Sequence, residues 1–333
     1  MMIKMGVCYN FYMKEFIIKE SSAGQRIDRY LSKLLPSASK LFIQKMIRKK
    51  NIKCNEKKTE PSYYTQLNDT IQIYFSDETI DKFLGKPQES CSLPQKYYSI
   101  FEQPVYEDQS LLVINKPKGL LTQPDSSKKI AVSDYVTQLY STPNDTFHPA
   151  PSNRLDYNSS GIVLIPKTYS TQKQINSAIS NRQVKKEYLT IVVGEMQKNL
   201  HLVHQLNKDE EQNKMHSVKI GSDFGKTASL ECFPIYSKDG FTLVRIILHT
   251  GRTHQIRIQL AEVGHPLIGD IKYGNPYWNK VVQDKFQLSY HLLHSYAYTL
   301  TDEDKTFTAP LPNYFTKTLE ILQFKDIHNG VLG

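Results

Sequence analysis

The sequence contains few cysteines, and they show no pairing pattern. Its 333 residues include only Cys8, Cys54, Cys91 and Cys232, which lie far apart in the chain. Because no Cys-x-x-Cys pair occurs, the sequence suggests neither a zinc site nor a disulfide framework. Scattered single cysteines of this kind fit a protein that works in a reducing cytosol.

Long hydrophobic runs are also missing. Lys4, Lys14 and Glu15 interrupt the apolar residues of segment 1–18, and no small-residue cleavage site follows them. No stretch approaches the roughly 20 apolar residues that a membrane-spanning helix needs. We therefore predict a cytoplasmic protein that has no membrane partner.

Acidic residues are outnumbered by basic ones. Lysine and arginine together count 42, against 33 for aspartate and glutamate, which gives a formal net charge of +9. This excess suggests a polyanionic partner such as nucleic acid, or an anionic membrane surface, although solubility alone explains it equally well. The apolar and aromatic fractions, 39% and 11%, are those of a folded protein. The length suggests two or three domains.

Residues 24–76 have the pattern of a compact unit of two helices and a strand. Apolar residues recur at helical spacing over 27–35, and a second helix with a serine cap extends through Arg48. The alternation of apolar residues over 71–75 then indicates a strand. We place this small domain at 24–76, after an N-terminal extension at 1–23.

The second helix of this unit has a basic face, formed by Lys45, Arg48 and Lys49. A helix–helix–strand unit with one basic face resembles the RNA-binding module named after ribosomal protein S-four, and the match covers about residues 25–75. The resemblance implies that these three side chains contact RNA. A solvated helix face is the alternative interpretation.

Residues 77–97 lack periodicity, contain prolines and several charges, and are predicted to form a linker. Beyond it, in a domain predicted at 98–333, short apolar runs indicate strands at 111–114, 162–165, 188–193, 229–235 and 241–248. Helical patterns cover 170–182 and 253–263, and the polar segment 197–223 is predicted to be a surface excursion. Strands with interspersed helices indicate an α+β architecture.

The most informative segment is 153–161, Asn-Arg-Leu-Asp-Tyr-Asn-Ser-Ser-Gly, which is followed at once by an apolar run. It places Asp156 close to Arg154 in a polar turn before a buried strand, which is typical of a carboxylate held at the mouth of a cleft beside a cation. Taken alone, the segment also fits a turn in which the aspartate bonds to its own backbone.

Three further segments accompany this turn: Asn-Lys-Pro-Lys-Gly-Leu at 115–120, Lys-Glu-Tyr-Leu at 186–189, and Thr-Gly-Arg-Thr-His-Gln-Ile-Arg at 250–257. The order and spacing of the four segments resemble the pseudouridine synthases of the RluA type, over about residues 107–313. The usual family motif reads His-Arg-Leu-Asp, two variable residues, then Thr-Ser-Gly. Here Asn153 replaces the histidine and Ser159 the threonine.

The resemblance implies a fold, a reaction and a partner. The fold is a mixed, mostly antiparallel β-sheet flanked by helices, preceded here by the small α/β RNA-binding domain. The reaction converts uridine to pseudouridine in structured RNA after base flipping, and it needs no cofactor and no metal. Large-subunit rRNA is the leading substrate, and transfer RNA is the alternative.

The resemblance also assigns roles to individual residues. Asp156 is the catalytic carboxylate, acting either as nucleophile or as general base. Tyr188 stacks on the flipped uracil and takes part in proton transfer at its carbon 5, while Arg257 keeps Asp156 ionised. Arg154 fills the space that the flipped nucleotide leaves, and Arg252 is the second candidate partner of Asp156. Phosphate binding is the alternative role for both Arg257 and Arg252.

Two other motif residues are counted among the RNA-contacting groups. Lys116, with the following proline and glycine, is predicted to shape a rigid loop that lines the cleft. His254 is predicted to be structural or to contact RNA, as are His291 and His294. No carboxylate or cysteine cluster completes a metal site around these histidines.

Two functions of other kinds compete with this interpretation. A catalytically silent RNA-binding factor of ribosome assembly would keep the fold and the basic surface, but it has no need of Asp156, Tyr188 and Arg257 together. A base-releasing N-glycosidase would use a carboxylate in a similar way, but nothing in the sequence marks a water-activating residue. The sequence does not select the target uridines, and a monomer is the default expectation.

Overall fold

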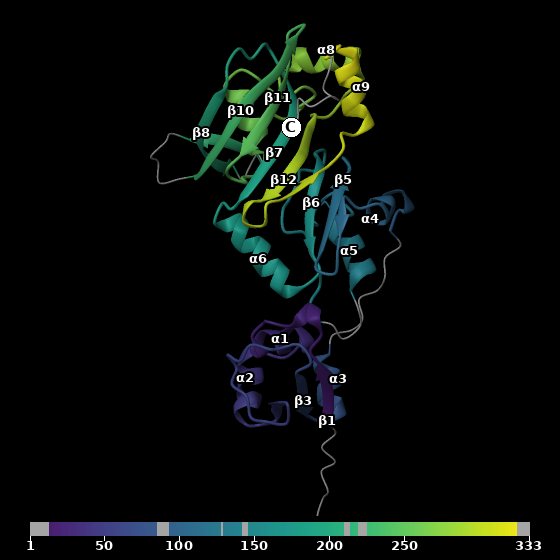
Figure 1. Ribbon diagram of the computed structural model, residues 1–333, viewed down its shortest axis with the longest axis vertical. Helices are drawn as coiled ribbons and strands as arrows, with labels where there is room; N and C mark the ends of the chain where they lie inside the picture. The colour runs from purple at the N-terminus through teal and green to yellow at the C-terminus, as the bar shows by residue number, and fades with distance from the viewer. Residues whose placement is uncertain are drawn as a thin grey trace, which may run out of the picture.

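The computed structural model describes residues 13–84, 93–127, 129–141, 146–209, 214–218 and 225–324. These residues form a small N-terminal domain and a large domain, each with a hydrophobic core of its own (Figure 1). Within them, no helix has the length and apolar character needed to cross a membrane.

The small domain packs helices against a three-stranded antiparallel sheet of order β1-β3-β2. Its elements are β1 (Met13–Ile17), a 3₁₀ turn (Glu20–Ser22), α1 (Ile27–Leu34), α2 (Lys40–Arg48), β2 (Ile52–Cys54), β3 (Thr70–Tyr74) and α3 (Asp77–Phe83). The predicted helix pair and strand are present. Ile27 and Leu31 of α1 and Ile43 and Ile47 of α2 are fully buried, because helical spacing places them on one face.

The predicted boundaries of this domain differ from the observed ones. β1 lies within the segment predicted as an extension, and it pairs with β3 along its whole length. α3 lies within the predicted linker, is capped by Ser76, and buries Ile80 completely in the core of the small domain. Such short edge elements bury too few side chains to show a period. The domain therefore spans 13–84 among the described residues.

The large domain is built on one sheet with strand order β4-β5-β6-β12-β7-β11-β10-β8-β9, and β13 pairs with β12. Only β6 and β12 run parallel among these pairs. The strands are β4 (Tyr106–Glu107), β5 (Leu111–Lys116), β6 (Ser160–Pro166), β7 (Val184–Val193), β8 (Leu200–Asp209), β9 (Lys214–Val218), β10 (Lys226–Lys238), β11 (Phe241–Leu248), β12 (Leu293–Leu300) and β13 (Lys305–Thr308). The predicted α+β class with a mixed, mostly antiparallel sheet is confirmed.

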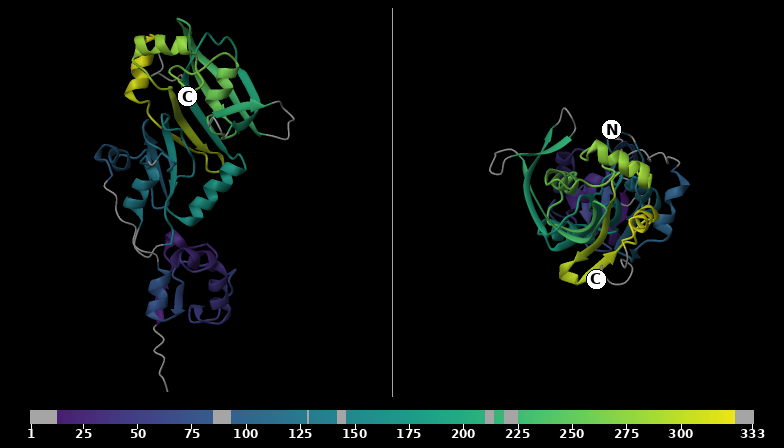
Figure 2. Two further views of the ribbon diagram at one scale, coloured as in Figure 1. Left: turned by 180° about the vertical axis from the view of Figure 1, so that it is seen from behind. Right: turned by 90° about the horizontal axis from the view of Figure 1, so that it is seen from above.

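Helices cover both faces of this sheet, so its central strands are buried on both sides. The helices are α4 (Ser99–Glu102), α5 (Val132–Tyr140), α6 (Tyr169–Ser180), α7 (Gln255–Glu262), α8 (Pro276–Phe286) and α9 (Asn313–Ile321), with 3₁₀ turns at Gln95–Tyr97 and Thr301–Glu303. One core cluster contains residues of α4, α5 and α7. Residues of α8 and α9 belong to a second cluster, and a residue of α6 belongs to a third. Figures 1 and 2 show α8 and α9 side by side, at the end of the large domain far from the small one.

The segment 197–223 is not the surface excursion that its polarity predicted. β8 pairs with β10 over seven residues, and β9 extends the sheet beyond β8. Leu202 and Leu206 are buried, which anchors β8 to the sheet. Residues 210–213 and 219–224 of the predicted excursion lie outside the described residues.

The two domains touch through a buried polar contact. Ser22 Oγ lies 3.1 Å from Thr146 Oγ1, and Gln25 Nε2 lies 3.4 Å from the same oxygen. Nearby, the Lys33 ammonium lies 5.7 Å from the ring centroid of Tyr169, at the start of α6. The small domain is thus positioned beside α6 (Figure 1).

Candidate active site

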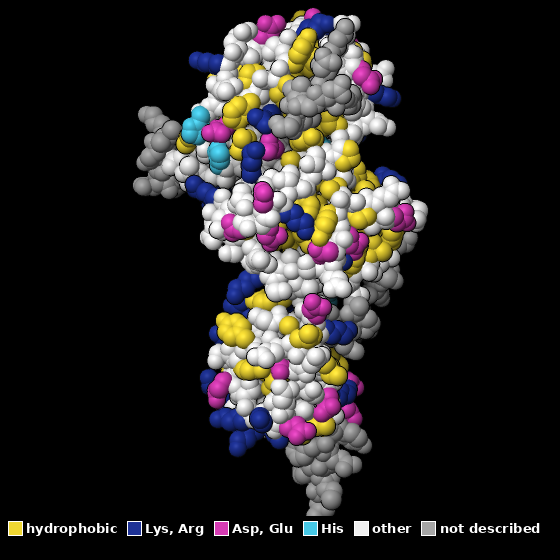
Figure 3. All heavy atoms as spheres, in the orientation of Figure 1, with side chains coloured by type: hydrophobic (Ala, Val, Ile, Leu, Met, Phe, Trp, Pro, Cys, Tyr) yellow, Lys and Arg dark blue, Asp and Glu magenta, His cyan; other side chains and the backbone are white. Residues whose placement is uncertain are grey.

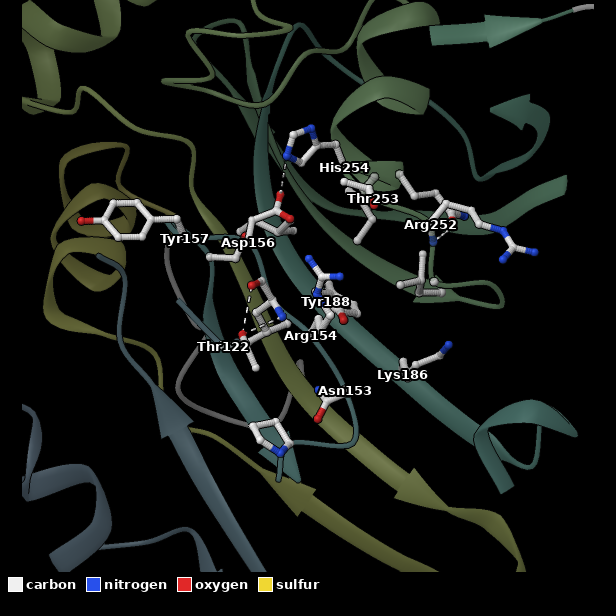
Figure 4. Close-up of a pocket in the computed structure, with 18 of the residues that line it drawn as sticks. Thr122, Asn153, Arg154, Asp156, Tyr157, Lys186, Tyr188, Arg252, Thr253 and His254 are labelled. Atoms are coloured by element: carbon white, nitrogen blue, oxygen red, sulfur yellow. Dashed lines mark hydrogen bonds and ion pairs between the residues drawn. The ribbon is translucent and has the colours of Figure 1, made fainter. Parts of the chain in front are cut away.

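A cleft of about 530 Å³ opens on the large domain, between the loops around residues 121–125, 151–159 and 251–257 and the strand β7. Three of the four sequence segments reach it. The predicted site residues that line it are Arg154, Asp156, Tyr188, Arg252, His254 and Arg257. Figure 4 labels the first five of them. The structure therefore brings together residues that lie more than a hundred positions apart in the sequence, such as Arg154 and Arg257.

Backbone contacts on both sides of Asp156 fix its position. The Thr122 hydroxyl accepts a hydrogen bond from the Leu155 amide at 3.1 Å and donates one to the Leu155 carbonyl at 3.0 Å. On the other side, the Gly119 amide donates to the Tyr157 carbonyl at 2.7 Å. Gly119 has a φ of +76°, a conformation that residues with a Cβ rarely adopt. The carboxylate is thus carried by a loop with little freedom.

Asn153 supports the same loop. Its side-chain amide donates to the Ile162 carbonyl at 2.9 Å and accepts from the Leu164 amide at 2.9 Å, so it pairs with the β6 backbone as a neighbouring strand would. A planar amide carries a donor and an acceptor side by side, which suits this arrangement. The turn-supporting interpretation of Asn153 fits these two bonds.

Arg257 lies between two carboxylates. Its Nε and Nη2 donate to the two oxygens of Asp270 at 2.6 and 2.9 Å, and its Nη1 donates to Asp156 Oδ2 at 3.1 Å. The side chains of Arg257 and Asp270 are 7% and 1% exposed, whereas that of Asp156 is 25% exposed. The bidentate pair with Asp270 therefore orients the guanidinium so that one nitrogen remains for Asp156.

The pKa values of the buried pair reflect this arrangement. Burial alone would lower the pKa of Arg257, but hydrogen bonds and charge from Asp270 and Asp156 raise it above its ordinary value. Burial alone would raise the pKa of Asp270, and the bonds to Arg257 outweigh this and lower it. The guanidinium and the Asp270 carboxylate therefore both stay charged beside Asp156.

Tyr188 and His254 complete the wall around the carboxylate. Burial raises the pKa of Tyr188 to about 12, so the phenol is protonated at neutral pH. His254 Nε2 lies 3.9 Å from Asp156 Oδ2, and its Nδ1 lies 2.8 Å from the Tyr273 hydroxyl. Burial lowers the pKa of His254, so its imidazole is neutral at pH 7. The cleft thus presents one partly exposed carboxylate, a fixed cation and an aromatic wall.

Comparisons with known proteins agree with this geometry. The family model of RNA pseudouridylate synthase matches residues 110–262. The ribosomal large subunit pseudouridine synthase C of Rickettsia typhi is 30% identical over 300 residues, which cover 88% of this chain and 96% of that protein. The protein of the same name from Buchnera aphidicola is 29% identical over 311 residues, which cover 92% and 96%. This chain belongs to the pseudouridine synthase family.

Solved structures show the same fold for this pseudouridine synthase. Human RNA pseudouridylate synthase domain containing 4 superposes with a TM-score of 0.57 at 22% identity, covering 68% of this chain and 94% of that one. Human RNA pseudouridylate synthase domain containing 1 gives 0.52 at 18% identity, covering 71% and 89%. Both superpositions support the α+β assignment.

The role predicted for Lys116 is wrong. Lys116 is fully buried and does not line the cleft, because its ammonium donates to the carbonyls of Pro117 and Leu120 at 2.9 and 2.7 Å. Burial lowers its pKa to about 7, although the charge of Asp156 opposes the shift. The lysine therefore holds the loop behind the cleft and cannot reach RNA. Pro117 and Gly119 likewise support the synthase cleft without lining it.

The remaining predicted RNA contacts fall into two places. Arg154 and Arg252 are exposed at the cleft, and Arg252 Nε donates to the Thr227 carbonyl at 3.1 Å. Lys45, Arg48 and Lys49 are exposed on α2 of the small domain, away from the cleft. Figure 3 shows lysine and arginine side chains gathered on the α2 side of that domain.

His291 and His294 are buried and bond to the β6 segment. His291 Nε2 lies 3.1 Å from Ser159 Oγ, and His294 Nδ1 lies 2.9 Å from Ser160 Oγ. Burial lowers the pKa of each imidazole to about 4, so both are neutral. Of the two interpretations that the sequence left open, the structure favours the structural one.

Sequence reasoning missed Asp270 and Thr122. Neither belongs to a periodic pattern, and a single aspartate after a glycine is an ordinary turn residue. No signal in the sequence indicated Thr122.

Proposed function

We propose that this pseudouridine synthase isomerises specific uridines of large-subunit ribosomal RNA and that Asp156 is its catalytic carboxylate. The substrate follows from the relatives, which are named ribosomal large subunit pseudouridine synthases. The observation that carries the catalytic assignment is the 3.1 Å bond between Arg257 and Asp156 inside a cleft that Tyr188 also lines.

The isomerisation detaches uracil from ribose, rotates it and reattaches it through carbon 5. A carboxylate can start this reaction by attacking the anomeric carbon of the sugar, or by removing a proton from carbon 2 of the ribose so that a glycal forms. In both routes Asp156 acts as a carboxylate, and Arg257 donates a hydrogen bond to one of its oxygens at 3.1 Å. The geometry is compatible with either route.

Tyr188 is proposed to stack on the flipped uracil and to take part in removing the proton from carbon 5. Its ring lines the cleft and its hydroxyl is protonated at neutral pH, so the oxygen can accept the carbon 5 proton only as it gives up its own. The uracil nitrogen that has left the ribose gains a proton in the product, which balances the proton lost from carbon 5. Tyr188→Phe separates the two roles. Loss of turnover with unchanged RNA affinity would assign the proton transfer to the hydroxyl, and unchanged turnover would limit Tyr188 to stacking.

Cationic side chains at the cleft and on the small domain are proposed to hold the RNA. Arg154 is exposed beside Asp156 and is long enough to occupy the space vacated by a flipped nucleotide. The basic face of α2, formed by Lys45, Arg48 and Lys49, is proposed to contact phosphates at a second place on the same RNA. The cytoplasmic location and the monomeric state stay predictions.

The test uses the reaction chemistry directly. Because carbon 5 of the uracil exchanges its hydrogen for the bond to ribose, RNA transcripts labelled with tritium at this carbon release tritium when pseudouridine forms. We expect wild-type protein to release tritium from large-subunit rRNA transcripts, and Asp156→Asn to release none while still binding.

Three results would contradict the proposal in different ways. Tritium release from transfer RNA alone would show that transfer RNA is the substrate in place of large-subunit rRNA. Free uracil among the products would indicate an N-glycosidase. Binding of the transcript with no release by the wild-type protein would support a silent ribosome-assembly factor.

A further inference from the structure

Lys186 lies in the cleft, and its charge has no partner among the described residues. It precedes Tyr188 by two residues on β7, it lines the cleft, and only 9% of its surface is exposed (Figure 4). No hydrogen bond or ion pair joins its ammonium to any other residue in the described part of the chain. Most of the side chain is withdrawn from water, while the ammonium nitrogen itself stays open to the cleft, so an anion that enters the cleft can reach it.

The surroundings of Lys186 are cationic. The carboxylates that line the cleft are Asp125 and Asp156, and both have partners: Asp125 accepts hydrogen bonds from Ser127, and Asp156 accepts one from Arg257. Burial lowers the pKa of Lys186, and the nearby charges of Arg182 and Arg252 lower it further. This end of the cleft therefore concentrates positive charge without neutralising it.

Arg252 faces the same end of the cleft. Its Nε is held by the Thr227 carbonyl at 3.1 Å, which leaves the two terminal nitrogens of the guanidinium for another acceptor. In Figure 4, Lys186 and Arg252 lie on the side of Tyr188 and Arg154 that is away from Asp156. The cleft thus has a carboxylate end and a cationic end, with the tyrosine ring between them.

The spacing along β7 fits a nucleotide. Side chains two residues apart on a strand point to the same side and lie roughly 6.6 Å apart along it. A base that stacks on Tyr188 has its own phosphate at a similar distance, beyond the ribose. An anion at Lys186 therefore matches the backbone of a nucleotide whose base enters the cleft.

We propose that Lys186, together with Arg252, forms a subsite for a backbone phosphate of the nucleotide that is flipped into the cleft. This inference rests on the proposed function, because it takes the Tyr188 wall as the place of the base. The ligand class is a phosphodiester, and the phosphate supplies the counter-ion that Lys186 lacks. Lysine and arginine are the usual phosphate ligands in proteins, the arginine through a fork of donors.

The neighbouring residue offers a matched control. Lys185 has an exposed side chain, forms an ion pair with Glu187 at 2.7 Å and does not line the cleft. Lys185→Gln removes the same charge from the same strand, one residue away. A general loss of positive charge would affect both variants, whereas a phosphate subsite requires Lys186 alone.

The experiment measures binding without turnover. The affinity for a large-subunit rRNA transcript is measured by filter binding for the Asp156→Asn variant. It is compared with that of three double variants, which carry Lys186→Gln, Lys186→Arg or Lys185→Gln in addition to Asp156→Asn. We expect Lys186→Gln to weaken binding about tenfold, the effect of one charged hydrogen bond, and to reduce the slope of log Kd against log salt by about 0.7. Lys186→Arg should restore most of the affinity, and Lys185→Gln should change it less than about twofold.

Two results would overturn the subsite. One is an equal effect of Lys186→Gln and Lys185→Gln on affinity and salt slope. The other is a loss of affinity in Lys186→Gln that Lys186→Arg fails to restore, although both variants unfold at the wild-type temperature. The proposed function is tested by a different measurement, the release of tritium by the wild-type protein. If that release is absent, the proposed function fails, whatever the binding comparison shows.

A chemical variant of the RNA tests the contact itself. Once a target uridine is mapped, a short RNA is made with a neutral methylphosphonate in place of the phosphate on either side of it. At the contacted position, wild-type protein should lose about tenfold in affinity, and Lys186→Gln should lose no more than about twofold further. The assignment would be contradicted if the losses of affinity caused by the methylphosphonate and by Lys186→Gln added up in full at both phosphate positions.

Discussion

Arg257 lies between two carboxylates of unequal exposure. Removing the buried one should mainly lower the stability of the protein, and removing the partly exposed one should mainly abolish turnover. Asp270 is 1% exposed and binds the guanidinium through two hydrogen bonds, at 2.6 and 2.9 Å. Asp156 is 25% exposed and binds it through one, at 3.1 Å. The geometry therefore gives Asp270 a structural role, and it leaves Asp156 available for the chemistry proposed above.

The expected magnitudes differ because the two sites differ in burial. Asp270→Asn leaves a buried guanidinium without its bidentate partner, and breaking a buried pair in this way costs about 3–5 kcal/mol of unfolding free energy. Asp156→Asn keeps Arg257 paired with Asp270 and changes a partly solvated contact, so its cost is about 1 kcal/mol or less. Turnover should behave differently, since Asp156→Asn removes it entirely and Asp270→Asn reduces it about a hundredfold by misplacing Arg257.

The assay combines urea unfolding with tritium release. Trp278 is the single tryptophan of the chain and lies in α8, so its fluorescence reports on the large domain. Asp302→Asn, at an exposed position of the 3₁₀ turn after β12, serves as the control for loss of one negative charge. Equal destabilisation by Asp156→Asn and Asp270→Asn, or wild-type stability of Asp270→Asn, would refute this division of roles.

Three further predictions concern the rest of the molecule. Neutralising Lys45, Arg48 and Lys49 together should weaken rRNA binding and reduce the salt slope by about 2–3, and unchanged affinity in filter binding would remove α2 from the interface. Because burial lowers the pKa of His291 to about 4, the unfolded chain takes up a proton between pH 6.5 and pH 4 that the folded chain does not. Stability should therefore fall by about 3 kcal/mol as the pH drops through this range, and urea unfolding of His291→Asn should show a weaker pH dependence. Gly161→Ala should destabilise by several kcal/mol, because its Cβ would collide with the backbone carbonyl oxygen of Ser295; a wild-type melting temperature would contradict this.

The sequence predicted those parts of the fold that have a clear period. The helices α1 and α2 and the strands β5, β6, β7, β10 and β11 follow from apolar spacing alone, and the structure contains all of them. β12 was not predicted as a strand, because its buried positions include His294 and Ser295, which hide the apolar pattern of a central strand. α5 was also missed, since it is short and most of its residues are poor helix formers.

The sequence predicted the motif residues of the site, but it did not predict the residues that hold them in place. Family resemblance placed Asp156, Tyr188 and Arg257 in one site, and the structure brings them to one cleft. Lys116 was misassigned because a lysine in a Lys-Pro-x-Gly turn is normally exposed, whereas here two backbone carbonyls hold it inside the protein. Asp270 became visible only through the distances around Arg257, since pairing between remote residues leaves no local pattern.

The central claim is that Asp156 performs uridine isomerisation on large-subunit rRNA. The most direct measurement is carbodiimide-based mapping of pseudouridine in total RNA from a deletion strain complemented with wild-type or Asp156→Ala protein. We expect pseudouridine to disappear from specific positions of large-subunit rRNA when the gene is deleted, and to return only with the wild-type protein. Restoration of the same sites by Asp156→Ala would contradict it, and so would a map that deletion leaves unchanged.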